Sequence, residues 1–179
     1  GIPSITESMR IKRDLDILRY TGGKLHIGLI STAEGVQIIR QAKKEGIAVS
    51  CDTPASNLLY TETDLLEFDP NFKLLPPLRS EQDRKALIKG LKDGTIDSIV
   101  SDHSPHDIEC KQKEFEDASF GGSTIEAVFS AALMALNDPE LAVLRLSSAA
   151  RRIYNKELNP IAVNTTADLT LFDPDLNWN

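Results

Sequence analysis

The sequence predicts an α/β fold whose parallel strands form half of a (β/α)₈ barrel. Short apolar runs alternate with helical patterns of about 10–15 residues, and this alternation is typical of βαβ units. Four of the runs are candidate barrel strands, whereas a full barrel needs eight strands and about 250 residues. Half a barrel leaves two open sheet edges, so we expect the chain to be a fragment or to be completed by other polypeptide.

The opening residues predict one helix and one strand. Ser4 and Glu7 have the spacing of a capping box, which begins a helix. Gly22 and Gly23 end that helix. The apolar run at residues 25–30 then predicts a buried strand.

A second helix and strand follow the same pattern. Ser31 and Glu34 have capping-box spacing, and Gly46 ends the predicted helix. Residues 47–53 predict the next strand, which Pro54 closes. The pattern therefore predicts a second parallel strand beside the first.

The middle of the chain predicts two more strands around one helix. Residues 72–75 are a short strand candidate that the pair Pro76-Pro77 stops. Ser80 and Asp83 resemble a helix N-terminal cap. Residues 96–101 form the fourth predicted strand.

The last third of the chain begins with a polar, glycine-containing loop at residues 102–122. Helices are predicted over residues 124–136 and again after the cap Asp138, where Pro139 occupies the first helical position. Residues 167–173 predict a final strand.

Composition and charge exclude several classes of protein. The formal net charge of −7 and the scattered basic residues argue against a nucleic-acid or anionic-membrane surface. No apolar run approaches the ~20 residues that span a bilayer. Cys51 and Cys110 lack the spacing of a zinc knuckle, so two reduced thiols in a cytoplasmic protein are expected.

Titratable residues cluster after the fourth predicted strand. Asp102, His103 and His106 follow it directly, where parallel barrels place their reactive groups. An aspartate there can ligate a metal or activate water, and His106 could hold an anionic group. A polar loop whose groups are satisfied locally is the other interpretation.

Several stretches resemble dihydroorotases, which are cyclic amidohydrolases. Residues 99–106, IVSDHSPH, resemble the family signature (A/S)TDHAPH. The other resemblances are residues 1–5 (GIPSI) to a mid-barrel segment, 25–33 (LHIGLISTA) to LHICHVSTA, 48–56 (AVSCDTPAS) to VTCEVTPHH, 68–79 (FDPNFKLLPPLR) to FDPNFKVNPPLR, and 167–174 (ADLTLFDP) to a strand returning to a small β domain.

The resemblance implies both a domain organisation and an activity. Residues 1–160 correspond to the C-terminal half of the amidohydrolase barrel, and residues 161–179 to the start of the segment that returns to a small β-sandwich domain. The implied activity is the zinc-dependent, reversible hydrolysis of dihydroorotate to carbamoyl aspartate in pyrimidine biosynthesis. A homo-oligomer in the cytoplasm, without nucleic-acid or membrane partners, is expected.

The resemblance also assigns roles to residues. Asp102 matches the family aspartate that touches the metal and transfers the proton of the attacking water, and His106 matches the histidine that binds the substrate carboxylate. Leu29 and Ala55 stand where the family has two metal-binding histidines, and Leu75 where it has a substrate-contacting asparagine. The resemblance therefore implies weak or absent zinc binding by this chain, because a catalytic zinc needs about three protein ligands.

Two histidines outside the family pattern are not expected to replace the missing ligands. His26 and Leu29 have opposite parity on a strand, so we expect His26 outside the barrel, under a helix. His103 adjoins Asp102 and is expected to point away from it. Two alternative functions remain open: an allantoinase- or hydantoinase-type hydrolase, and a catalytically degenerate, non-catalytic subunit that scaffolds aspartate transcarbamoylase.

Overall fold

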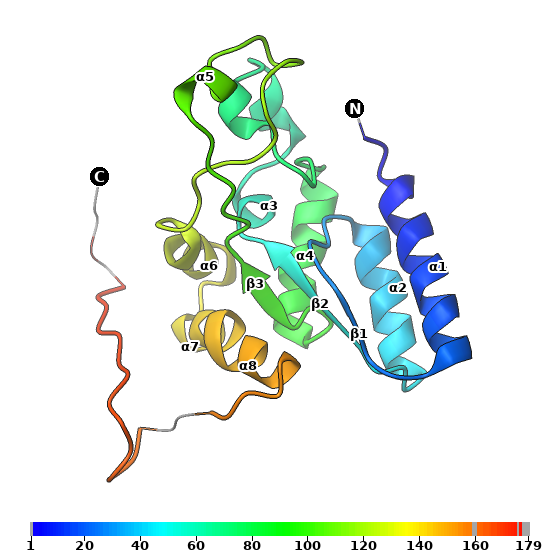
Figure 1. Cartoon of the computed structure of the whole chain (residues 1–179), viewed down its shortest axis with the longest axis vertical. Helices are drawn as coiled ribbons and strands as arrows, with labels where there is room; N and C mark the ends of the chain where they lie inside the picture. Colours follow the sequence, from blue (N-terminus) through cyan, green and yellow to red (C-terminus); the bar gives the residue numbers. More distant parts are fainter. Residues whose placement is uncertain (1, 159–160, 175, 177–179) are drawn as a thin grey trace.

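The computed structural model describes residues 2–158, 161–174 and 176. It contains a three-stranded parallel sheet in the order β1-β2-β3, flanked by helices (Figure 1). The elements are α1 (Ile5–Thr21), β1 (Leu25–Ile27), α2 (Ala33–Lys44), β2 (Val49–Pro54), α3 (Ser56–Leu59), η1 (Glu62–Leu65), η2 (Pro70–Phe72), α4 (Glu81–Asp93), β3 (Ser98–Val100), α5 (Ile108–Lys111), α6 (Val128–Leu136), α7 (Pro139–Val143), the π-helical turn η3 (Leu144–Ser148) and α8 (Ala149–Ile153).

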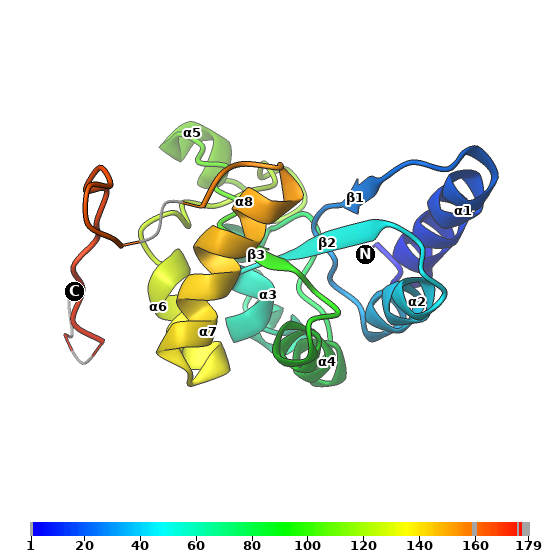
Figure 2. The same ribbon diagram turned by 90° about the horizontal axis from the view of Figure 1, so that it is seen from below.

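The βαβ order confirms the predicted α/β class. β1 pairs with β2 in parallel with α2 between them in the chain, and β2 pairs with β3 with α4 before it. Both helices lie along one face of the sheet (Figures 1 and 2). This is the arrangement of strands and outer helices in part of a (β/α)₈ barrel.

The strand predicted at residues 72–75 is wrong. Its first residue ends the short 3₁₀ helix η2, which Asp69 caps by accepting a hydrogen bond from the Asn71 N–H. The residues that follow run into a cis peptide bond between Leu75 and Pro76. β2 pairs directly with β3 instead, so three of the four predicted strands form the described sheet.

Two of the three expected capping boxes are wrong. Ser80 and Asp83 cap α4 reciprocally, as predicted. Ser4 makes no side-chain cap on α1, and Thr32 rather than Ser31 caps α2. The Glu7 carboxylate is the cause, because it reaches across to accept hydrogen bonds from the backbone and hydroxyl groups of both Ser31 and Thr32.

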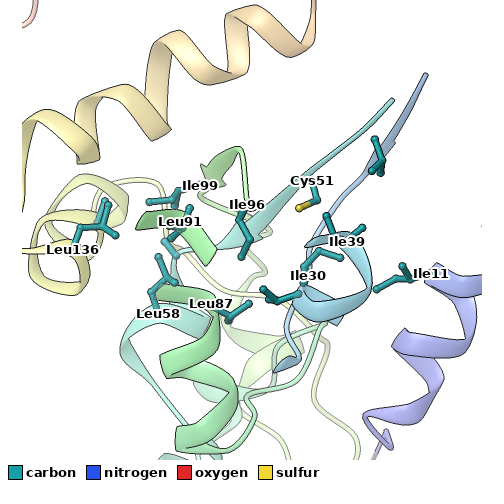
Figure 3. Close-up of a cluster of buried hydrophobic side chains, with 14 of the residues drawn as sticks. Ile11, Ile30, Ile39, Cys51, Leu58, Leu87, Leu91, Ile96, Ile99 and Leu136 are labelled. Atoms are coloured by element: carbon teal, nitrogen blue, oxygen red, sulfur yellow. The ribbon is translucent and has the colours of Figure 1, made fainter. Parts of the chain in front are cut away.

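The hydrophobic core lies between the sheet and its outer helices. Figure 3 shows Ile39 of α2, Leu87 and Leu91 of α4, and Cys51 of β2 directed into this layer. These four side chains are at most 1% exposed. Burial raises the pKa of the Cys51 thiol to about 12, so this cysteine is a packing residue and not a nucleophile.

The C-terminal helices and the long loop lie at opposite ends of the strands. Helices α7 and α8 lie beneath the N-terminal ends of the strands, and α5 with its loop lies above their carboxyl ends (Figure 1). Asp138 caps α7 with Pro139 at its first position, as predicted. The helix predicted from residue 124 begins later, at Val128.

The final strand predicted at residues 167–173 is wrong, because those residues carry no ladder hydrogen bonds. Their side chains are largely exposed, although the ring of Phe172 packs edge-on against Phe129 of α6 at 4.6 Å. The predicted domain boundary at residue 160 falls outside the described residues and stays a prediction. In the described part of the chain, no helix is long and apolar enough to cross a membrane.

Candidate functional site

The inner face of the sheet, opposite α2 and α4, carries polar side chains. Along β2, Val49 and Cys51 point into the helix-side core, so Ser50 and Asp52 point to the other face. The register pairs His26 of β1 with Ser50. Three polar side chains from two strands therefore lie together on the face that becomes a barrel interior.

Asp52 is the centre of this cluster. Its Oδ1 accepts the backbone N–H of Leu29 at 2.6 Å, and its Oδ2 lies 2.9 Å from His26 Nε2. The Asp52 side chain is 11% exposed. A Cβ added to Gly28 would lie 3.8 Å from Asp52 Oδ1, so the backbone of residue 28 passes close to the carboxylate. The two hydrogen bonds hold this carboxylate in one orientation.

Asp102 follows β3 at the carboxyl end of the sheet, as predicted. Its backbone is in the left-handed region, with φ of 51°, a conformation that Asp and Asn tolerate better than most residues. Burial raises the pKa of the Asp102 carboxyl, and the negative charge of Asp52 raises it further. Asp102 therefore resists ionisation more than an exposed aspartate.

The two histidines of the signature lie in the loop rather than beside Asp102. His103 accepts hydrogen bonds at Nδ1 from the N–H groups of Thr124 and Ile125, at 3.1 and 3.2 Å. It anchors the loop through these bonds, and its expected direction away from Asp102 stays a prediction. His106 is exposed and donates from Nε2 to the carbonyl of Phe120 at 2.9 Å.

His106 lines a surface cavity of about 690 Å³ together with Asp69, Asn71 and Lys111. The Lys111 ammonium donates to the carbonyls of Ser119 and Gly121, and burial lowers its pKa. The loop thus places the His106 imidazole and the Lys111 ammonium around one surface cavity. The structure shows no direct contact between His106 and Asp102 among the described residues.

The three positions that depart from the family pattern have different surroundings. Leu29 is half-buried, has φ of 60° and lies outside the hydrophobic core. Ala55 is 3% exposed and belongs to that core. Leu75 is 51% exposed. The Ala55 side chain therefore packs in the hydrophobic core.

The residues of this chain do not fit the zinc that the family implies. Among the residues that the structure describes, no three His, Cys, Asp or Glu side chains converge in a way that could hold a metal ion. Leu29 and Ala55 provide no donor atom, and His26 is engaged by Ser50 and Asp52. A catalytic zinc needs about three such ligands, so no chemical step is assigned to a metal here.

The predicted position of His26 is wrong, and the role of Asp52 was missed. His26 lies on the inner face with Asp52 and not under a helix. The parity argument fails because β1 ends at Ile27, and the left-handed backbone of Leu29 breaks the alternation. The alternation of apolar Val49 and Cys51 with polar Ser50 and Asp52 in the sequence was the available signal for this cluster.

Solved structures with the same fold are cyclic amidohydrolases. An L-hydantoinase (dihydropyrimidinase) from Arthrobacter aurescens matches with a TM-score of 0.80 and 28% identity, covering 86% of this chain and 36% of that one. A D-hydantoinase matches with a TM-score of 0.77 at 21% identity over 84% of this chain and 35% of its own, which supports the fold alone. The chain is thus part of an amidohydrolase barrel.

Sequence relatives narrow this class. No family model matches the chain. A dihydroorotase of Shouchella clausii is 39% identical over 99% of this chain and 43% of its own length. A dihydroorotase of Syntrophus aciditrophicus is 36% identical over the same shares. The chain spans less than half the length of these relatives, and over that span it is similar to dihydroorotases.

Proposed function

We propose that this chain is the C-terminal part of a dihydroorotase-type barrel that interconverts dihydroorotate and carbamoyl aspartate in the cytoplasm. The observation that carries the proposal is Asp102, an acid just after β3 whose pKa is raised by burial and by the charge of Asp52. It occurs in a chain that is 39% identical to a dihydroorotase over nearly all its residues. Cys51 and Cys110 are both free thiols, which is consistent with a reducing compartment.

In this proposal Asp102 transfers the proton. Opening a cyclic amide needs a group that accepts a proton from the attacking water and returns it to the departing nitrogen. Burial and the charge of Asp52 raise the pKa of Asp102, which brings it nearer to the range in which a carboxyl can do both. His106 and Lys111, around the neighbouring hollow, supply the hydrogen-bond donors and charge for a substrate carboxylate.

We also propose that the metal site is impaired. Leu29 and Ala55 lack ligand atoms, and Ala55 is turned into the core. We therefore expect zinc to be retained at well below one equivalent after dialysis at nanomolar free metal. Elemental analysis of the complete gene product that carries this segment is the measurement, and near-stoichiometric zinc would contradict the proposal.

Turnover is tested separately from metal content. Asp102→Ala should reduce ring closure of carbamoyl aspartate by about 100-fold or more, because proton transfer loses its acceptor. Asp117→Ala, at an exposed loop position, is the matched control and should leave turnover unchanged. Full activity in the Asp102→Ala protein would overturn the assigned role. Hydantoin and allantoin serve as comparison substrates for the related hydrolases.

A non-catalytic subunit is the second candidate function, and the donor-free residues Leu29 and Ala55 favour it. In that case the protein scaffolds aspartate transcarbamoylase, with homo-oligomer formation as part of the same assembly. The expected result is no turnover in the parent protein, together with co-purification of aspartate transcarbamoylase with both the parent and the Asp102→Ala protein. Turnover that disappears in the variant would reject this candidate.

A further inference from the structure

Residues 68–74 pack against the loop that follows β3, at the carboxyl end of the sheet. The loop with α5 lies next to these residues (Figure 1). The ring of Phe68 packs edge-on against Phe115 at 5.7 Å. A Cβ added to Gly122 would lie 3.4 Å from Leu74 Cδ2. Both segments belong to this chain, so their packing needs no strand from the rest of a barrel.

Lys73 places a buried cation at this contact. The residue is 8% exposed, and its Nζ donates to the carbonyl of Glu116 at 2.7 Å. The same Nζ lies 4.8 Å from the centre of the Phe120 ring and 5.6 Å from that of Phe115. The backbone carbonyl of Lys73 accepts the N–H of Gly121 at 2.9 Å. Lys73 therefore holds the returning part of the loop through both its side chain and its backbone.

The part of the loop that Lys73 holds supports the segment that carries His106. His106 Nε2 donates to the Phe120 carbonyl at 2.9 Å. The N–H of Ser104 donates to the Gly122 carbonyl at 3.0 Å. A Cβ added to Gly121 would lie 2.5 Å from the Ser104 carbonyl oxygen, which is closer than real Cβ atoms approach. The two segments are thus in tight contact, and the Phe120 carbonyl orients the His106 imidazole.

The buried ammonium of Lys73 contributes position more than stability. Taking a cation out of water costs free energy, which a carbonyl and two aromatic faces offset only in part. An apolar side chain of similar length would fill the same space without that cost. It would not hold the Glu116 carbonyl or attract the face of the Phe120 ring. A methionine at this position should therefore preserve the fold and release the loop.

We propose that Lys73 is a positioning residue, whose ammonium keeps the Phe120 carbonyl in place to orient the His106 imidazole. That His106 then binds a substrate carboxylate rests on the proposed function. Among the described residues, the cavity beside His106 is lined by Asp69 and Lys111 but not by Lys73. Loss of the Lys73 ammonium should therefore weaken carboxylate binding without removing a group that touches the substrate.

The first test needs no turnover. It measures how fast diethyl pyrocarbonate modifies His106 in the complete gene product that carries this segment, by peptide mass mapping. Lys73→Met should speed the reaction at least about threefold, because the imidazole loses its fixed acceptor. Lys73→Arg keeps the cation and should stay closer to the parent rate. Lys89→Met, at an exposed position of α4, is the matched control and should leave the rate unchanged.

Two outcomes of this test overturn the proposal. One is an unchanged rate of His106 modification in a folded Lys73→Met protein. The other is a Lys73→Met protein that does not fold, because the ammonium would then stabilise the fold rather than place the loop. Thermal melts followed by circular dichroism establish which variants fold.

The second test separates this proposal from the proposed function. Succinate, a dicarboxylate probe, should slow the modification of His106 in the parent, and Lys73→Met should need about tenfold more succinate for the same protection. Equal protection of both proteins overturns the positioning role. Absence of protection in the parent contradicts carboxylate binding by His106 instead, and the rates without succinate then decide the role of Lys73.

Kinetics add a readout that a purely structural role would not give. In a parent protein that turns over, Lys73→Met should raise the KM for carbamoyl aspartate about tenfold and lower kcat less than about threefold. Lys73→Arg should restore most of the KM. A fall in kcat at unchanged KM would overturn the proposal, because the substitution would then act on the chemical step and not on carboxylate binding.

Discussion

The two faces of β2 differ in what they contribute. On the helix side, Val49 and Cys51 are at most 7% exposed and pack against α2 and α4. On the inner side, Ser50 and Asp52 are both hydrogen-bonded to His26. One strand thus contributes apolar packing from one face and a hydrogen-bonded polar cluster from the other, as in barrels whose outer helices bury the core.

The carboxylates of Asp52 and Asp102 also differ in their surroundings. Asp52 has two hydrogen-bond donors and a fixed orientation. The Asp102 pKa is raised, and the raised value follows from burial and from the neighbouring charge of Asp52. The inner face therefore contains one satisfied carboxylate and one that is held in an unfavourable environment, and the second is the better candidate for proton transfer.

The largest expected loss of unfolding free energy comes from substitutions in the helix-side core. Leu91 is 0% exposed, so Leu91→Ala should lower the free energy of unfolding by about 3 kcal/mol. Leu29 is half-buried and outside the core, and Leu29→Ala should cost less than about 1 kcal/mol. Urea unfolding measures both. Equal losses would mean that the two faces of the sheet are packed alike.

The next largest loss of stability is expected for Glu7, a polar side chain that bridges two helices. Glu7 of α1 receives hydrogen bonds from Ser31 and Thr32 at the start of α2. Glu7→Gln should reduce the free energy of unfolding by about 2 kcal/mol, since charge-assisted bonds are lost. Glu34→Gln removes an exposed ion pair with Lys12 and should leave the free energy of unfolding nearly unchanged.

Urea unfolding again provides the measurement, with both glutamine variants compared at the same pH. A Glu34→Gln loss as large as that of Glu7→Gln would restore Ser31 and Glu34 as the capping box that the sequence predicts, and would contradict the cross-helix role of Glu7.

Local patterns predicted the elements that depend on near neighbours. The reciprocal cap of Ser80 and Asp83 joins residues three apart, and it is present. Glu7 instead satisfies groups 24 and 25 residues away, a choice that depends on how α1 packs and that no local spacing encodes. Residues 72–75 were predicted as a strand, but β2 pairs directly with β3, so no sheet edge is open to them between these two strands.

In the candidate site, too, local features could be predicted from the sequence and long-range contacts could not. Asp102 could be predicted because a strand end is a local feature. The link from Asp52 to His26 spans 26 residues and depends on the register of β1 with β2. The direction of the Ala55 side chain could not be predicted by parity either, because Ala55 already has helical backbone angles at the start of α3.

The smallest expected effect concerns the cost of placing Asp102 on the inner face. Its pKa is raised, mainly by burial and then by Asp52. A carboxyl with a raised pKa in the folded state stabilises the fold below its unfolded pKa, and this contribution is lost as pH rises through the folded value. Asp102→Asn keeps the shape and tolerates the left-handed backbone, so at pH 7 it should raise the Tm by about 1–2 °C.

Asp107 is the matched control with the opposite sign. Hydrogen bonds from Cys110 lower the Asp107 pKa at the start of α5, so its contribution is present above the unfolded pKa and disappears as pH falls through the folded value. Asp107→Asn should therefore lower the Tm slightly at pH 7. Near pH 3 both differences should shrink, because the carboxyls become protonated. A lower Tm for Asp102→Asn at pH 7 would show that the Asp102 charge is stabilised on the inner face, and would remove the reason for assigning it the proton transfer.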